Sequence, residues 1–196
     1  MFERHEQWMA RYGRVYQDNA EKKRQLKIFT KNVGFIDSFN NARTQSYKLG
    51  INQLADLTNE EFKASHVGYI PTRSSTVTPF RYENVSAVPS SMDWRKKGAV
   101  TAIKDQGQCV SVSIDASGYK FQFYVTGVFP GVCGTELDHG VTAVGYRTSD
   151  AGTKYWLVKN SWGTTWGEEG YIRMQRDIDA KTSLCGIAMD ASYPTA

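Results

Sequence analysis

The sequence predicts an α+β protein, with helices in its N-terminal part and strands in most of its C-terminal half. Apolar residues at positions 26, 29, 33 and 36 follow the three- and four-residue spacing of one helix face. Val112–Ile114 and Tyr171–Met174 alternate apolar and polar residues, which is typical of half-buried strands. A stretch rich in proline, serine and threonine lies between these regions, so we expect two parts joined by a linker.

Two helices are expected at the N-terminus. Trp8 and Tyr12 lie four residues apart on one face of a short helix that should end near Gly13. The second helix begins near Ala20, and its charged residues form the solvent-facing remainder.

A short strand over residues 47–52 and a third helix are expected next. Thr58 and Glu61 have the three-residue spacing of a capping box, in which the threonine hydroxyl and the glutamate each satisfy a free backbone N–H. This spacing is common by chance, but the adjoining Phe62 favours a true helix start.

Residues 68–89 predict an extended linker. The linker contains a formal glycosylation sequon at Asn84, which has meaning only if the chain is secreted. After the linker, strands are predicted over residues 110–115, 121–125, 139–146, 155–160 and 170–176.

Composition excludes several classes of function. The net charge is +4 and no cluster of basic residues is interleaved with aromatic ones, so nucleic acid is not an expected partner. No apolar run reaches the roughly 18 residues that a membrane-spanning helix needs, so we expect no membrane partner. The first residues lack the apolar core of a signal peptide, which predicts either a cytosolic protein or a chain whose leader is missing.

Three segments resemble the precursors of papain-like cysteine proteases, most closely the plant senescence-associated type. The expected helix resembles the first prosegment motif, the following strand resembles the second, and Val88–Arg95 resembles the start of the mature enzyme. The matching prosegment residues are Glu21, Phe29, Asn32, Ile36 and Asn40, then Gly50, Asn52, Leu54 and Asp56.

The resemblance implies three regions. They are a propeptide inhibitor domain over residues 1–63, a prosegment linker over 64–87, and a peptidase domain over 88–196 with a gap after Cys109. The implied fold is papain-like but lacks most of its left, helical lobe, which leaves mainly the β-rich right lobe. The face that met the missing lobe would be open, so we expect marginal stability.

The resemblance also assigns site residues. His139 matches the catalytic histidine, Asn160 the amide that orients it, and Trp162 the ring that shields their contact from water. Gln106 matches the donor that stabilises the oxyanion. The family needs no metal or other cofactor.

The nucleophile is the residue that the pattern lacks. The cysteine of papain-like enzymes precedes its histidine by about 130–150 residues, whereas Cys109 precedes His139 by 30. Cys109 matches a structural cysteine three positions before the nucleophile, which leaves it only a weak candidate for that role. The remaining cysteines, Cys133 and Cys185, match the disulfide of the right lobe.

The sequence therefore leaves two functions open. One is a cysteine endopeptidase precursor by descent, with peptide or protein substrates but little or no activity in this chain. The other is a propeptide-like inhibitor of intact papain-like proteases, with an inert truncated product as a further alternative. The chain does not indicate its compartment, while the family is vacuolar, lysosomal or extracellular.

Overall fold

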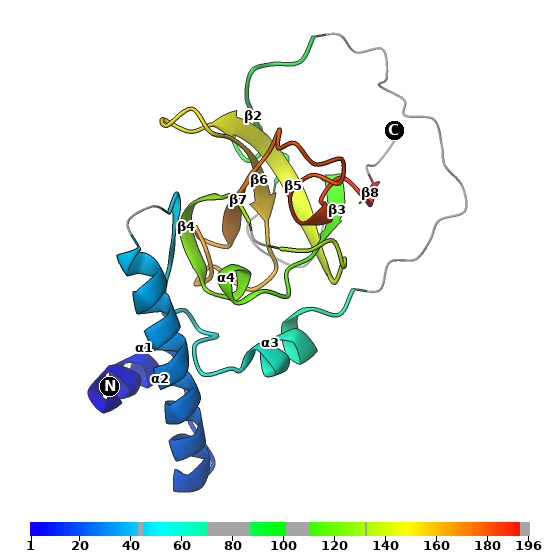
Figure 1. The fold of residues 1–196 in the computed structure, drawn as a ribbon. Helices are drawn as coiled ribbons and strands as arrows, with labels where there is room; N and C mark the ends of the chain where they lie inside the picture. Colours follow the sequence, from blue (N-terminus) through cyan, green and yellow to red (C-terminus); the bar gives the residue numbers. More distant parts are fainter. Residues whose placement is uncertain (43–44, 70–86, 101–109, 132, 193–196) are drawn as a thin grey trace.

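The protein is described here by a computed structural model, which covers residues 1–42, 45–69, 87–100, 110–131 and 133–192 (Figure 1). The N-terminal region contains α1 (Phe2–Tyr12), α2 (Asn19–Asn41), β1 (Tyr47–Leu49) and α3 (Asn59–His66). The C-terminal region contains β2 (Met92–Asp93), β3 (Val110–Ile114), α4 (Tyr119–Gln122), β4 (Tyr124–Phe129), β5 (His139–Thr148), β6 (Lys154–Lys159), β7 (Tyr171–Gln175), the 3₁₀ turn η1 (Leu184–Gly186) and β8 (Ala191–Ser192).

The N-terminal helices pack on a small aromatic cluster of their own. Gly13 ends α1 in a left-handed conformation with φ of 62°, as the sequence predicts. Trp8, Phe29 and Val33 are buried together between α1 and α2, and the Trp8 indole N–H donates to Asn52 O at 2.8 Å. This hydrogen bond satisfies the one polar atom of the buried ring.

Three asparagines fix the extended segment that follows α2. Asn32 donates from Nδ2 to Ala55 O and Leu57 O, both at 2.9 Å. Asn40 donates to Leu49 O and accepts from Leu49 N, while Asn52 donates to Gln122 O. An amide can pair with backbone donors and acceptors at once, which explains why this residue type occurs at these positions.

The capping box at the start of α3 is confirmed. Thr58 accepts from the Glu61 N–H at 3.1 Å, and the Glu61 carboxylate accepts from the Thr58 N–H at 2.9 Å. The threonine hydrogen bonds lower the pKa of Glu61, and Arg24 acts in the same direction. Phe62, one turn into the helix, is fully buried.

The C-terminal region forms a mixed sheet with the order β1-β4-β7-β6-β5-β3-β8, and β2 also pairs with β5. Most neighbours are antiparallel, whereas β4 and β7 are parallel. The N-terminal region contributes β1, which pairs with β4 and so forms one end of the sheet (Figure 1).

One hydrophobic core joins the two regions. It contains Ile36, Leu54 and Phe62 from the N-terminal region together with aromatic residues of the C-terminal region, among them Phe121 and Trp166. The N-terminal region therefore covers apolar surface that the sheet would otherwise expose to water.

The strand prediction for residues 121–125 is wrong at its start. Residues 119–122 form the helical turn α4, and β4 begins only at Tyr124. The aromatic run favours a strand by propensity, but the backbone carbonyl of Gln122 accepts from both Asn52 Nδ2 and Trp166 Nε1. Tertiary hydrogen bonds thus override the local preference.

The other predicted strands agree with the structure to within two residues at each end, except that the first ends at Leu49 rather than residue 52. The sequon at Asn84 and most of the predicted linker lie outside the described residues. No helix in the described part of the chain is long and apolar enough to span a bilayer.

We predict that Thr58→Ala lowers the free energy of unfolding by about 1 kcal/mol, because α3 loses its N-terminal cap. Urea denaturation followed by circular dichroism measures the change. Thr30→Ala is the matched control: its hydroxyl bonds to Leu26 O within α2, caps no helix, and is exposed. Equal stability of Thr58→Ala and the unmodified chain would contradict the prediction.

Candidate functional site

The structure brings His139 and Asn160 together. His139 is the first residue of β5, and Asn160 follows the last residue of the neighbouring strand β6. The two side chains are both buried, and His139 Nε2 lies 2.8 Å from Asn160 Oδ1.

The surrounding hydrogen bonds define the tautomer of the imidazole. Asn160 Oδ1 also accepts from the Ser161 N–H at 2.8 Å, which identifies it as the acceptor atom of the amide. His139 must then donate from Nε2, and the neutral ring keeps its lone pair on Nδ1. The arrangement leaves Nδ1 as the atom able to take a proton.

Trp162 covers this pair. Its ring stacks on His139 with the centroids 4.7 Å apart, and it also meets Phe62 of α3 edge to face. Gln53 donates from Nε2 to Trp162 O, and the indole N–H donates to His66 O. The N-terminal region therefore holds the tryptophan in place from two sides.

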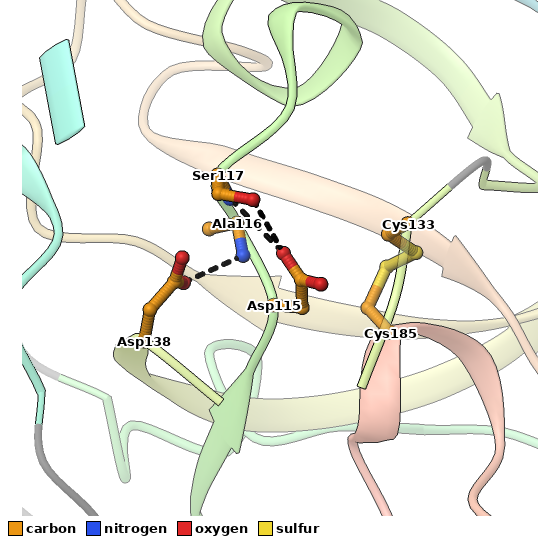
Figure 2. The surroundings of a disulfide bond; sticks show 6 residues. All are labelled: Asp115, Ala116, Ser117, Cys133, Asp138 and Cys185. Atoms are coloured by element: carbon orange, nitrogen blue, oxygen red, sulfur yellow. Dashed lines mark hydrogen bonds between the residues drawn. A yellow bond between two sulfur atoms is a disulfide. The ribbon is translucent and has the colours of Figure 1, made fainter. Parts of the chain in front are cut away.

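The start of β5 is fixed by β3 and by the disulfide region (Figure 2). Ile114 pairs with His139 in the sheet, and the Asp138 carboxylate accepts from the Ala116 N–H at 2.8 Å. The Asp115 N–H donates to Cys185 O, and Cys185 is bonded to Cys133. The disulfide that the resemblance implied is therefore linked, through Asp115 and Ala116, to the segment that begins β5 at His139.

Burial shifts the pKa of two groups at the start of β5, Asp138 and His139. Desolvation lowers the pKa of His139, while the hydrogen bond to Asn160 opposes this and nearby His66 adds to it. Desolvation raises the pKa of Asp138, with the hydrogen bond from Ala116 opposing it. His139 is therefore held neutral and able to act as a base at neutral pH.

The end of the N-terminal region is bonded to the backbone beside His139. The backbone N–H groups of Gly68 and Tyr69 both donate to Asp138 O, at 2.9 and 2.8 Å. Asp138 directly precedes His139, so residues 68–69 are held against the backbone at the start of β5.

Two predicted site residues, Gln106 and Cys109, lie outside the described residues. Within the described ranges, no three His, Cys, Asp or Glu side chains gather in a way that would hold a metal ion.

Two family models match the chain. The model described as cathepsin propeptide inhibitor domain (I29) matches residues 5–62. The model described as papain family cysteine protease matches in two stretches, residues 88–112 and 110–195.

Individual proteins show the same likeness. The senescence-specific cysteine protease SAG39 of Oryza sativa subsp. indica is 38% identical, and the alignment covers 100% of this chain and 91% of that protein. Ananain of Ananas comosus is 32% identical, with 100% and 88% covered. Among solved structures, a recombinant stem bromelain precursor superposes with a TM-score of 0.90 at 33% identity, covering 99% of this chain and 98% of that one.

The alignment with the rice protein extends over 308 positions, whereas this chain has 196 residues, so more than a hundred positions have no residue here. The two stretches of the peptidase match meet at residues 110–112, where β3 begins. The family match, the relatives and the superposed fold agree, and this chain belongs to the papain family of cysteine proteases, as a precursor that carries its propeptide domain.

Proposed function

We propose that this chain descends from a papain-family endopeptidase precursor and that it hydrolyses peptides slowly or not at all, because its nucleophilic cysteine is missing. The observation that carries the proposal is the pairing of His139 with Asn160 under Trp162, which provides a base and its orienting amide. In this role His139 would take the proton of a thiol, Asn160 would fix its tautomer, and Gln106 would stabilise the oxyanion.

The cysteine count supports the absence of a nucleophile. The chain has three cysteines, and Cys133 and Cys185 form a disulfide with an S–S length of 2.04 Å. Cys109 is therefore the single remaining thiol. The resemblance assigns this position to a structural cysteine rather than to the nucleophile.

The local structure after Cys109 also argues against a catalytic role for it. A nucleophilic cysteine of this family gains a lowered pKa from the N-terminus of its helix and from the paired imidazole. Here Val110 begins strand β3 and pairs with Ala143, so no helix starts at this point. A strand that begins at residue 110 provides no helix dipole there to stabilise an ionised thiol.

The alignments support an internal loss of sequence as the origin of this chain. The relatives contain more than a hundred positions that are absent here, and the peptidase match resumes at residue 110. A loss of this size after Cys109 accounts for the missing helical lobe. We propose the same regions as the sequence suggests: the inhibitor domain over 1–63, the linker over 64–87 and the shortened peptidase domain over 88–196.

Inhibition of intact relatives is the second candidate function. The propeptide inhibitor model matches almost the whole N-terminal region, and that region has a buried cluster of its own around Trp8. Its partner would be an intact papain-like protease. As the family implies, the compartment would be vacuolar, lysosomal or extracellular.

We predict that the full chain turns over a fluorogenic dipeptide substrate slowly or not at all, and that an epoxide inhibitor leaves Cys109 unlabelled in mass spectrometry. The physical reason is the proposed loss of the nucleophilic cysteine, without which His139 has no thiol to activate. Turnover that His139→Ala abolishes, or labelling of Cys109, would refute the proposal. Thiol titration in denaturant serves as the control and should give one free thiol per chain.

The pKa of His139 provides a second test. Because burial lowers this pKa, the unfolded chain binds the proton more tightly than the folded chain. The contribution of His139 to stability is therefore complete above the ordinary value of 6.5 and is lost as the pH falls below it. An NMR titration of the ring should give a pKa below 6.5.

Asn160→Ala should lower the pKa of His139 further, because the hydrogen bond to Asn160 favours the charged imidazole. The same NMR titration measures the change. A higher pKa in this variant would show that the amide does not act on the ring as described.

The inhibitor function predicts that the full chain slows an intact papain-family protease in a concentration-dependent manner. Trp8→Ala should weaken the inhibition, since it removes the largest side chain of the cluster between α1 and α2. Val15→Ala is the matched control because Val15 is 89% exposed. Inhibition that is the same in both variants, or absent altogether, would exclude this role.

A further inference from the structure

Gln53 of the N-terminal region forms two hydrogen bonds with the loop that follows β6. Its side-chain amide donates from Nε2 to Trp162 O at 2.8 Å, and its Oε1 accepts from the Thr165 hydroxyl at 2.9 Å. Trp162 is the ring that stacks on His139. The glutamine therefore ties the N-terminal region to the loop that carries the cover of the imidazole.

The backbone around Gln53 is fixed by other contacts. Its neighbours Asn52 and Leu54 are both 1% exposed, and the Leu54 N–H donates to Asn52 Oδ1. The Gln53 carbonyl accepts from the Arg14 guanidinium at 2.9 Å. Because the segment is held at these points, little backbone freedom is lost when the Gln53 side chain binds its two partners.

The amide of Gln53 can satisfy both partners in one orientation only. A side-chain amide has a donor group on one side and an acceptor oxygen on the other. The Trp162 carbonyl only accepts, so the donor group of the amide must face it and the amide oxygen must face position 165. Serine or threonine at that position supplies the matching hydroxyl donor. Valine leaves the oxygen without this partner, and an acidic side chain repels it.

The side chain at position 165 can change without disturbing the core. Thr165 is exposed, whereas the next residue, Trp166, is fully buried and donates to Gln122 O. The tryptophan fixes the loop, so a different side chain at position 165 alters the contact with Gln53 and leaves the packing in place. A contact of this kind distinguishes partners, because it adds affinity for one and costs affinity for another.

We infer that Gln53 is a specificity-determining residue of the N-terminal region. It selects a papain-like partner region that offers a hydrogen-bond donor at the position of Thr165, whether that region lies in this chain or in an intact relative. The part that concerns relatives rests on the second proposed function, inhibition of an intact protease. The partner so defined is a papain-family protease with serine or threonine at that position.

The full chain provides the first test. Thr165→Val and Thr165→Ser are made with Gln53 intact and in a Gln53→Leu background, and amide hydrogen exchange at Gly50 is followed by NMR. The Gly50 N–H donates to Phe123 O at 2.9 Å, a bond between the two regions, so its exchange reports how firmly they are docked. With Gln53 intact, Thr165→Val should speed the exchange about fivefold, and Thr165→Ser should leave it within about twofold. In the Gln53→Leu background, Thr165→Val should not speed it.

Thr164→Val is the matched control. Thr164 is the adjacent exposed threonine of the same loop, while the hydroxyl that bonds to Gln53 is that of Thr165. Its replacement should leave the exchange at Gly50 unchanged in both backgrounds.

The second test uses an intact papain-family protease with threonine at the aligned position, compared with the same enzyme carrying valine there. The unmodified chain should inhibit the threonine enzyme about fivefold more strongly, and the Gln53→Leu chain should show no such preference. Release of the chain's own C-terminal region costs the same with both enzymes, so it does not alter the ratio.

The inference is overturned if Thr165→Val leaves the exchange at Gly50 unchanged, or if its effect is as large in the Gln53→Leu background. It is also overturned if inhibition occurs without a preference for the threonine enzyme. Absence of any inhibition would refute the inhibitor function, and the exchange result would still decide the role of Gln53 within the chain.

Discussion

The constraint on which the structure depends is that its two regions share one hydrophobic core. The N-terminal region contributes Ile36, Leu54 and Phe62 to the aromatic interior of the sheet. It also forms hydrogen bonds with the C-terminal region. The Asn52 amide and the Trp166 indole N–H both donate to the Gln122 carbonyl. In a chain with so short a C-terminal region, the propeptide acts as part of the fold, because it covers apolar area that water would otherwise meet.

The same packing explains why the candidate site keeps its geometry. Trp162 touches His139 on one side and Phe62 on the other, so the ring that shields the imidazole is itself held by the propeptide. The tautomer of His139 follows from a backbone N–H that donates to Asn160 Oδ1. These contacts come from the sheet and the propeptide, which together hold His139 and Asn160 in this arrangement.

The sequence predicted those parts of the structure that depend on residues close together in the chain. The helix faces, Gly13 at the end of α1 and the Thr58 capping box depend on neighbours within a few residues. The family resemblance assigned His139, Asn160 and Trp162 to one site. The turn at Tyr119–Gln122 and the contacts of Tyr69 were not predicted, because each depends on partners at least 44 residues away, such as Trp166 for Gln122 and Asp190 for Tyr69. Patterns of neighbouring residues do not predict partners so far apart in the chain.

Strand β1 has a consequence beyond the core. Its three residues pair with β4 at one border of the sheet, and Gly127 of β4 approaches Ser46 and Tyr47 so closely that a Cβ atom there would collide with their backbone. Without β1, the unpaired N–H and C=O groups of β4 would be available to a strand from another molecule. The propeptide strand therefore covers an edge of the sheet that could otherwise pair with another chain.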